Sequence, residues 1–419
     1  MPGIEKTGSR FYNVENSRKE STEVYMSRRP TKKKRMAILV VVFLAAALLF
    51  VWQEREGIRG AILTWDEEVP YQQVSLEERS LEDKYYYGQI PEEDQKAYQE
   101  VLEGLREHKE EIYVHCEKAE RANELFVLVL KDFPEIFWCD GRVTATAYSG
   151  GEPYTVLEPR YLCGAEEQKE REQEIQEEAR EWLAGAPADA GDFEKIQYVY
   201  ETIVDQVEYE AEAPDGQNIY SVLVNRRSVC AGYAKATQYL LERLGVFCTY
   251  VTGETREGES HAWNLVLCEG DYYYVDTTWG DPVFQSEEGE EQQGYINYDY
   301  LCCSEEELFR THTPDGDVEL PRCTSMDWNY YVVNGMYYTD YDREEILKKM
   351  NQVISEGGNP SVFKFSDEKI YEQAREGILG DLIKRAADNL GRWYDLTEVH
   401  YRYLDQESQN KITIYWQYE

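Results

Sequence analysis

Three short segments between residues 228 and 281 constrain the fold of this chain more than any other feature. They are Ser228-Val229-Cys230-Ala231-Gly232-Tyr233-Ala234, Ser260-His261-Ala262-Trp263-Asn264 and Tyr274-Val275-Asp276-Thr277-Thr278-Trp279. In order, they supply a thiol, an imidazole and a carboxylate. Cleavage of an amide by a thiol needs a nucleophile, a base that accepts its proton and an acid that orients the base. We therefore predict that Cys230, His261 and Asp276 meet in one pocket.

Cys230 is predicted to begin a helix. Apolar residues recur after it at helical spacing as far as Leu244, and Gly245 follows as a C-terminal stop. At a helix N-terminus, the dipole and the free backbone N–H groups favour a thiolate. The same N–H groups could hold a developing oxyanion. The predicted position of Cys230 is therefore one that suits a nucleophile.

His261 and Asp276 are predicted to share one face of a β-hairpin. Apolar residues alternate after His261 as far as Leu267, and Glu269-Gly270 is a plausible two-residue turn. Such a turn pairs Trp263 with Asp276, so Asp276 becomes the diagonal neighbour of His261. Diagonal neighbours in a sheet are roughly 7–8 Å apart, a gap that an imidazole and a carboxylate can close.

The three segments resemble the motifs of the transglutaminase-like superfamily of papain-type thiol enzymes, which run Cys-x-Gly-Tyr-Ala, His-Ala-Trp-Asn and Val-Asp-x-Thr-Trp-Asp-Asp-Pro. In this chain Gly280 stands in place of the first Asp of the Asp-Asp pair. The resemblance is best over about residues 190–325, and it is strongest to bacterial membrane-anchored members. It implies an α+β, papain-type core, in which the helix that begins at the cysteine packs on an antiparallel sheet, with small α/β regions beside it.

The resemblance also implies a reaction. His261 removes the proton of Cys230, the thiolate attacks an amide carbonyl, and Asp276 orients His261. Water would resolve the resulting thioester in a peptidase or deamidase, and an amine would resolve it in an acyltransferase. The bacterial members favour a protease-like or cell-surface role over calcium-dependent cross-linking, and the sequence contains no Asp-x-Asp-x-Asp-Gly calcium loop. The alternative is a catalytically silent module of the same fold that binds the cell surface or cell wall.

The loop that leads to Cys230 holds further candidate residues. Gln217, Asn218 and Tyr220 could supply an oxyanion donor or a cleft wall, as could Trp263, and the sequence does not choose among them. His312 is a rival base, but we expect it in a loop without an adjacent orienting carboxylate. No Cys-x-x-Cys pair or histidine cluster has metal-ligand spacing, so we expect neither a metal nor another cofactor.

An uncharged run from residue 36 to residue 52 is predicted to span a membrane, although seventeen residues lie at the short end for such a helix. The alternative is a cleaved signal peptide. However, the run follows a 35-residue head, is long for a signal and lacks a small-residue cleavage site. Because the head is basic, the positive-inside rule predicts a single-pass protein with a cytoplasmic N-terminus and an extracytoplasmic body.

The charge of the chain is divided unevenly between head and body. Residues 1–35 carry ten Lys or Arg and four Glu, a net charge of +6, whereas the whole chain carries −38. An acidic body argues against nucleic-acid binding. We expect a protein or peptide substrate, with the cell envelope as one source, and the sequence leaves the oligomeric state open. Since nine cysteines is an odd number, disulfides would leave at least one thiol unpaired, and we expect that thiol to be Cys230.

The domain organisation follows from these segments. We predict a cytoplasmic tail (1–35), a transmembrane helix (36–53), a juxtamembrane connector (54–84), an N-terminal α/β region (85–188), a transglutaminase-like catalytic domain (189–328) and a C-terminal small α/β domain (329–419). Within the last two we expect a strand at Tyr298–Leu301 and a hairpin at Tyr330–Tyr338 that turns at Asn334-Gly335.

Overall fold

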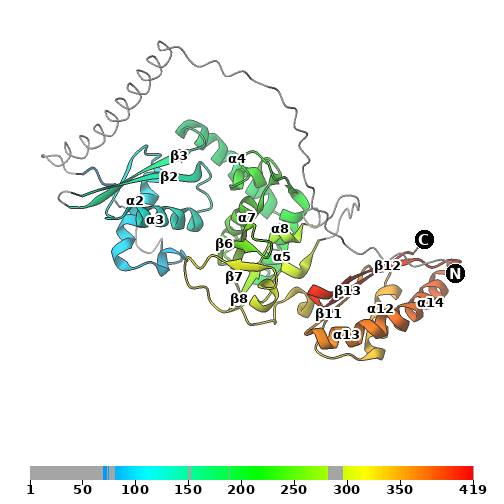
Figure 1. The fold of residues 1–419 in the computed structure, drawn as a ribbon. Helices are drawn as coiled ribbons and strands as arrows, with labels where there is room; N and C mark the ends of the chain where they lie inside the picture. Colours follow the sequence, from blue (N-terminus) through cyan, green and yellow to red (C-terminus); the bar gives the residue numbers. More distant parts are fainter. Residues whose placement is uncertain are drawn as a thin grey trace, which may run out of the picture. The chain divides into compact units, whose positions relative to one another are not determined.

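Helices and strands are mixed along the part of the chain that the structure describes (Figure 1). The structure, a computed structural model, describes residues 69–72, 74, 81–149, 152–187, 189–281 and 296–418. The tail predicted at 1–35, the membrane span predicted at 36–53 and most of the connector predicted at 54–84 lie outside these residues. In the described ranges no helix is long and apolar enough to cross a membrane.

The N-terminal region consists of two helices and a three-stranded antiparallel sheet. The helices α2 (Glu92–Arg106) and α3 (Ala119–Asp132) pack against each other and against the strands. The strands lie in the order β1 (Ile112–Val114), β3 (Tyr154–Tyr161), β2 (Cys139–Tyr148), and the 3-10 turn η2 (Tyr87–Gln89) precedes them. The buried positions of α3 recur at helical spacing, as expected for a helix with one apolar face: Ala122, Leu125, Phe126 and Val129.

The central region holds an antiparallel sheet in the order β8 (Asp271–Val275), β7 (Ser260–Cys268), β6 (Cys248–Thr255), β9 (His312–Pro314). Its helical elements are α4 (Ala165–Leu183), α5 (Asp192–Gln206), α6 (Ile219–Leu223), α7 (Cys230–Arg243), α8 (Thr277–Gly280), η3 (Tyr298–Tyr300) and α10 (Glu305–Leu308). Two short parallel strands, β4 (Glu208–Tyr209) and β5 (Arg227–Ser228), lead toward Cys230. The α+β class predicted from the sequence is confirmed.

The helix α7 packs against β6 and β7, so its first residue faces the sheet that carries His261. It begins at Cys230 because Val229 is extended, with φ −115° and ψ 176°. It ends where Gly245 adopts a φ of +76°, a conformation that glycine takes without steric cost. The predicted helix and its glycine stop are confirmed.

The hairpin of β7 and β8 has the predicted register. Cys268 pairs with Asp271 and Asn264 pairs with Val275, so the chain leaves the sheet at Asp276. Glu269 and Gly270 both have positive φ, 51° and 101°, as a two-residue turn of this kind requires.

The C-terminal region is a four-stranded sheet with three longer helices. The strands lie in the order β10 (Tyr337–Tyr338), β11 (Ser361–Phe365), β13 (Lys411–Trp416), β12 (Tyr401–Gln406), and only the β10–β11 pair is parallel among the described strands of this sheet. The helical elements are α11 (Tyr330–Val333), α12 (Arg343–Ser355), α13 (Glu368–Gly377), the π-helical turn η4 (Ile378–Leu382), α14 (Ile383–Tyr394) and η5 (Glu407–Gln409). The region has its own apolar core.

Two local predictions are wrong, and asparagine capping explains both. The hairpin predicted at Tyr330–Tyr338 is the helical turn α11 followed by β10, because the Asn329 side chain accepts a hydrogen bond from the Tyr331 N–H. Gly335, with a φ of +62°, ends that turn. The strand predicted at Tyr298–Leu301 is the 3-10 turn η3, because the Asn297 side chain accepts from the Asp299 N–H.

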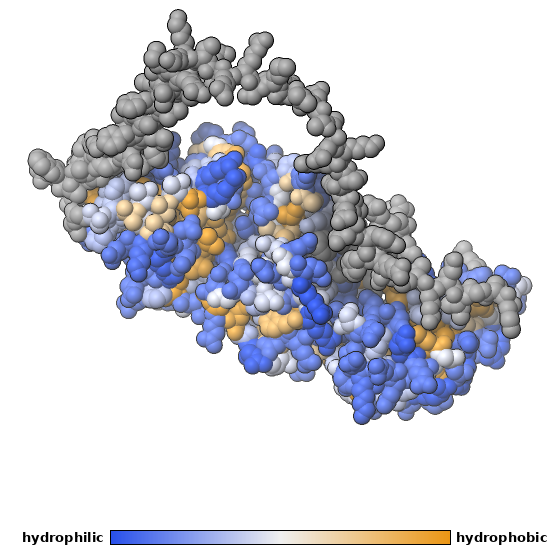
Figure 2. Space-filling model, viewed as in Figure 1, coloured by the Kyte–Doolittle hydropathy of each residue, from blue (hydrophilic) through white to orange (hydrophobic). Residues whose placement is uncertain are grey.

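Polar contacts join the N-terminal region to the central region, and all three regions belong to one unit over residues 69–419. The Tyr86 hydroxyl donates to the Tyr250 carbonyl over 2.7 Å, and the Lys131 ammonium donates to Thr252 Oγ1 over 2.7 Å. The visible face of the molecule is mainly hydrophilic (Figure 2), in keeping with a chain of which 30% is charged. The domain boundaries drawn from the sequence remain predictions.

Candidate active site

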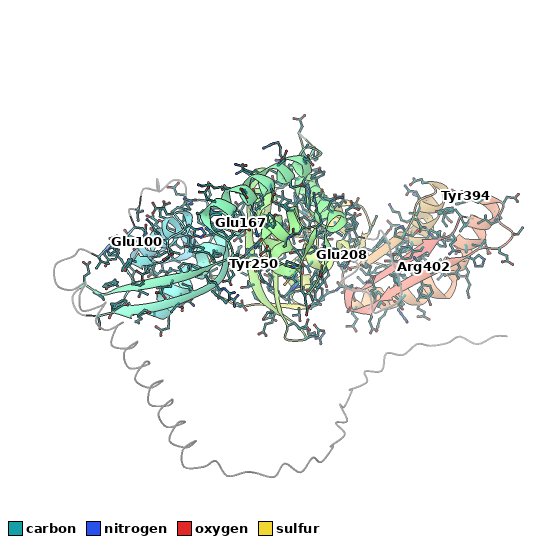
Figure 3. The ribbon with its side chains drawn as sticks, turned by 90° about the horizontal axis from the view of Figure 1, so that it is seen from above. Glu100, Glu167, Glu208, Tyr250, Tyr394 and Arg402 are labelled. Atoms are coloured by element: carbon teal, nitrogen blue, oxygen red, sulfur yellow. The ribbon has the colours of Figure 1, made fainter. Side chains whose placement is uncertain are left out.

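Cys230 lies at the first position of α7 and is partly exposed. All nine cysteines lie in the described residues and are free, and the other eight are buried. The Cys230 side chain packs beside a small cluster that includes Tyr250, which lies on β6 and is labelled in Figure 3, and Ala262 on β7. Cys230 is therefore the cysteine that a solvent-borne substrate or reagent reaches most easily.

The start of α7 leaves backbone donors free. The first helical bond runs from the Tyr233 N–H to the Val229 carbonyl, and no side chain caps the helix. The N–H groups of residues 230–232 therefore have no acceptor within the helix. They lie beside the thiol, where they could stabilise negative charge on an attacked carbonyl.

His261 and Asp276 form a buried hydrogen-bonded pair. The His261 Nε2–H donates to Asp276 Oδ2 over 2.7 Å, and both residues are buried. Because Nε2 is engaged by Asp276, Nδ1 is the ring nitrogen that would exchange a proton with a thiol. Cys230 contributes to the raised pKa of His261. Of the three residues predicted to meet, the structure therefore joins His261 and Asp276 by a hydrogen bond, and the meeting of all three in one catalytic pocket stays a prediction.

The pKa values of this pair move in opposite directions. Burial alone would lower the pKa of His261, but the Asp276 carboxylate and the Cys230 thiol raise it from 6.5 to about 10. Burial alone would raise the pKa of Asp276, but its two histidine partners hold that pKa well below the ordinary value. At neutral pH the pair is therefore an imidazolium and a carboxylate, and the imidazole binds a thiol proton strongly.

Asp276 is held by its other atoms as well. Its Oδ1 accepts from the N–H groups of Thr278 and Trp279 over 2.9 and 3.1 Å, which makes Asp276 the N-cap of α8. Its own N–H donates to the carbonyl of Tyr300 over 3.0 Å. The carboxylate is thus fixed by the local chain, which leaves Oδ2 directed at the imidazole.

His312, which the sequence analysis ranked below His261 as a base, is a functional candidate in the structure. Its Nε2–H donates to Asp276 Oδ2 over 3.1 Å, and its Nδ1 lies 2.8 Å from the hydroxyl of Thr311. The expectation of a loop without an adjacent carboxylate is wrong, because His312 lies on β9, which pairs with β6, and its ring is buried. The pairing joins residues far apart in the sequence, so no local pattern reveals it.

His261, Asp276 and His312 also form the one group of three possible metal ligands found among the described residues, with ligand atoms within 4.8 Å of one another. This set could bind a divalent ion such as Zn²⁺. However, both imidazoles direct an Nε2 at the same carboxylate oxygen over hydrogen-bond lengths. Hydrogen bonds therefore account for the short distances among these three side chains without a metal ion.

The remaining candidates have other contacts. Gln217 is exposed, and its carbonyl accepts from Lys235 over 3.1 Å. Asn218 caps α6 by accepting from the Tyr220 N–H over 2.9 Å, and the Tyr220 hydroxyl donates to Glu174 over 2.7 Å. These contacts neither establish nor exclude an oxyanion role.

Trp263 lies behind the imidazole and is fully buried. The two rings are stacked with centroids 6.1 Å apart, and the Trp263 indole N–H has no partner among the described residues. Trp263 therefore forms an apolar wall of the site, and its role in a reaction remains a prediction.

Gly280, the departure from the family motif, has a steric reason. A Cβ at this position would lie 2.4 Å from the hydroxyl oxygen of Tyr200, a buried residue of α5 whose hydroxyl donates to the Asn297 carbonyl. The aspartate of the common motif would not fit against this ring. The following residue keeps a partner, because Asp281 Oδ2 accepts from the Tyr233 hydroxyl over 3.0 Å.

Comparison with known proteins places a family domain over this site. Residues 178–277 match the family model of the transglutaminase-like superfamily. The kyphoscoliosis peptidases of Mus musculus and Homo sapiens are each 30% identical over 105 residues, which cover 21% of this chain and 16% of those proteins. A crystal structure of a TGase matches 36% of this chain and 47% of its own, at 12% identity and a TM-score of 0.26, which is too low to carry weight.

Residues 178–277 are therefore a transglutaminase-like domain. The matched segment contains Cys230, His261 and Asp276, whereas His312 lies beyond it. Because the match covers only a small part of the peptidases, their activity and substrates are not thereby assigned to this chain.

Proposed function

We propose that this protein is a thiol enzyme that acts on amide bonds of proteins or peptides through a thioester on Cys230. The observation that carries the proposal is the arrangement of His261. Its Nε2 is hydrogen-bonded to Asp276 over 2.7 Å, and the Cys230 thiol at the start of α7 contributes to the raised pKa of the same imidazole. A nucleophile, a base and an orienting acid are the parts that acyl transfer needs.

The reaction proceeds in two halves. In the resting site the proton of the Cys230 thiol is held on His261 as an imidazolium, and the thiolate attacks the amide carbonyl to form a tetrahedral oxyanion beside the N–H groups at the start of α7. The oxyanion collapses to a thioester, and His261 gives its proton to the departing amine. Water then attacks the thioester while His261 accepts a proton from that water, which releases the acid and restores the thiol. An amine in place of water would complete an acyl transfer.

We favour hydrolysis over cross-linking. The resemblance of the three motifs to bacterial members of the superfamily supports a protease-like role, and so does the likeness of the matched segment to proteins described as peptidases. The choice between the two acceptors depends on access to the thioester, which the triad alone does not decide.

We further propose that a single membrane span over residues 36–53 anchors the enzyme, with the body outside the cytoplasm. The uncharged run at 36–52 and the basic head of net charge +6 support this topology. Protease added to the cytoplasmic face of sealed membrane vesicles should then leave the body intact. Digestion of the body from that face would reverse the topology.

The decisive experiment for the chemistry is capture of the acyl-enzyme. The full chain is incubated with a cell-envelope protein extract, quenched in acid and digested, and adducts on Cys230 are sought by mass spectrometry. A thioester on Cys230 that is absent from Cys230→Ala and forms much more slowly in Asp276→Asn would support the enzyme. Absence of any adduct, with unchanged extract binding by Cys230→Ala, would instead favour the catalytically silent binding module.

A further inference from the structure

Two buried lysines connect the C-terminal region to the candidate site. Lys364 on β11 and Lys411 on β13 are each about 1% exposed, and both contact Asp299 of η3. The Lys364 ammonium lies 3.1 Å from Asp299 Oδ1 and 3.1 Å from Glu307 Oε1. The Lys411 ammonium also donates to the Tyr331 hydroxyl over 3.2 Å.

This network is balanced in charge and almost fully removed from water. Two ammonium groups face two carboxylates. Burial alone would raise the pKa of Asp299, but the two lysines hold it well below its ordinary value. A buried ion network adds little net stability compared with apolar packing, yet removal of one member is costly because its partner stays buried and unpaired. Such a network is better suited to fixing a precise arrangement than to adding stability.

The arrangement that it fixes lies directly behind Asp276. Asp299 is followed by Tyr300, whose carbonyl accepts the Asp276 N–H over 3.0 Å. On the same segment, the Asn297 N–H donates to the Gly280 carbonyl over 3.0 Å, and Tyr274 and Cys303 exchange two backbone hydrogen bonds of 3.0 Å. The backbone of residues 297–303 therefore forms the support against which the carboxylate-bearing segment 274–280 rests.

We propose that Lys364 and Lys411 are positioning residues of the candidate active site, which act through Asp299 to hold the Tyr300 carbonyl against the Asp276 backbone. The C-terminal region thereby helps to aim the Asp276 carboxylate at His261. This role rests on the proposed function for its catalytic meaning, but the geometry it controls can be measured without turnover.

The test separates positioning from simple stabilisation by restoring charge balance. Lys411→Met leaves the network one positive charge short, and Asp299→Asn leaves it one negative charge short. The double variant is balanced again, because Lys364 then faces Glu307 alone. We expect both single variants to lower the unfolding midpoint of the full chain and the double variant to recover most of that loss.

Positioning is read from the His261 ring by NMR titration of full-length protein with labelled histidine. The chain has five histidines, so the signals can be assigned by single substitutions. In the wild type we expect the pKa of His261 to be about 10. In the double variant we expect this pKa to fall toward 6.5, although stability is recovered. A double variant that recovers both stability and the high His261 pKa would overturn the proposal.

Met350→Ala is the matched control, since Met350 is fully buried in the apolar core of the C-terminal region. It should lower the unfolding midpoint while the pKa of His261 stays at its wild-type value; a lowered His261 pKa in this variant would also count against specific positioning.

Alkylation of Cys230 by iodoacetamide distinguishes the positioning proposal from the proposed enzyme function. If Cys230 of the wild type is alkylated slowly although the pKa of His261 is near 10, the proposed enzyme function is refuted. The proposed positioning role of the two lysines is not refuted by that result.

Discussion

One carboxylate oxygen of Asp276, Oδ2, accepts hydrogen bonds from two histidines. The bond from His312 is 3.1 Å long and the bond from His261 is 2.7 Å long. His312 therefore gives Asp276 a second side-chain restraint beside that of His261. A carboxylate held by two imidazoles and two backbone N–H groups has little freedom to rotate, so its orientation toward His261 is set before substrate binds.

Replacement of His312 should impair turnover more than substrate binding. His312→Phe removes the donor to Asp276 Oδ2, whereas His312→Gln keeps an N–H near the same place. We expect kcat to fall by about 10²-fold in His312→Phe, the size of effect that a small misplacement produces, and by much less in His312→Gln, with KM near the wild-type value in both. The exposed His400→Gln is the control. Equal losses in the Phe and Gln variants would argue against positioning by the Nε2–H.

Asp276→Asn should abolish most activity while the fold is kept. An asparagine oxygen can still cap α8 through the N–H groups of Thr278 and Trp279, so local structure has a reason to survive. The amide cannot stabilise the imidazolium of His261 or fix its tautomer, and the corresponding loss in a serine triad is about 10⁴-fold in kcat. Steady-state kinetics beside circular dichroism would measure both effects. Wild-type kcat in a folded variant would remove Asp276 from the mechanism.

The same substitution predicts a pH window for stability. The pKa of His261 is raised above its unfolded value, so its contribution is fully present below about pH 6.5 and is lost as pH rises through about 10. The pKa of Asp276 is depressed, so its contribution is present above its unfolded value near 3.8 and is lost in stronger acid. The difference in unfolding midpoint between wild type and Asp276→Asn should thus be largest between about pH 4 and 6.5 and should shrink toward pH 10. A difference that is constant over this range would contradict the assigned ion pair.

The local elements of the site could be predicted from sequence because local signals specify them. Glu269-Gly270 fixes the hairpin register, and through it the position of Asp276 relative to His261. The start of α7 follows from the residues after Cys230. In contrast, His312 reaches Asp276 only through the pairing of β9 with β6, and Lys364 reaches Asp299 through the packing of separate regions. No short-range pattern encodes such contacts.

Ambiguous local signals explain the wrong predictions. Asn334-Gly335 suits a hairpin turn, but it suits the end of a helical turn equally well, because both need a residue with positive φ. The deciding factor is Asn329, whose side chain caps α11. In the same way the aromatic run at Tyr298–Tyr300 has strand-like composition, but the Asn297 cap selects a 3-10 turn.

Removal of divalent metal should leave the enzyme active. His261, Asp276 and His312 could ligate an ion, yet their hydrogen bonds already satisfy the three groups. We expect full activity after dialysis against EDTA, and inhibition by added Zn²⁺, because an ion at these atoms would displace the proton that His261 shares with Asp276. Loss of activity on chelation with recovery on adding metal would identify a metal centre instead. Metal analysis of the purified protein by mass spectrometry provides an independent check.

Gly280→Ala tests whether close packing behind the site, rather than loop freedom, requires glycine at this position. An added Cβ would meet the ring of Tyr200 at 2.4–2.9 Å, and both residues are buried, so the ring or α8 must shift. Overpacking of this kind costs about 1–3 kcal/mol, and we expect a lower unfolding midpoint together with a lower kcat, because α8 is capped by Asp276. Tyr200→Leu removes the ring atoms in conflict. We therefore expect Gly280→Ala to lower the unfolding midpoint less when it is made in the Tyr200→Leu background than when it is made in the wild type. Additive losses would place the cause in the backbone of α8.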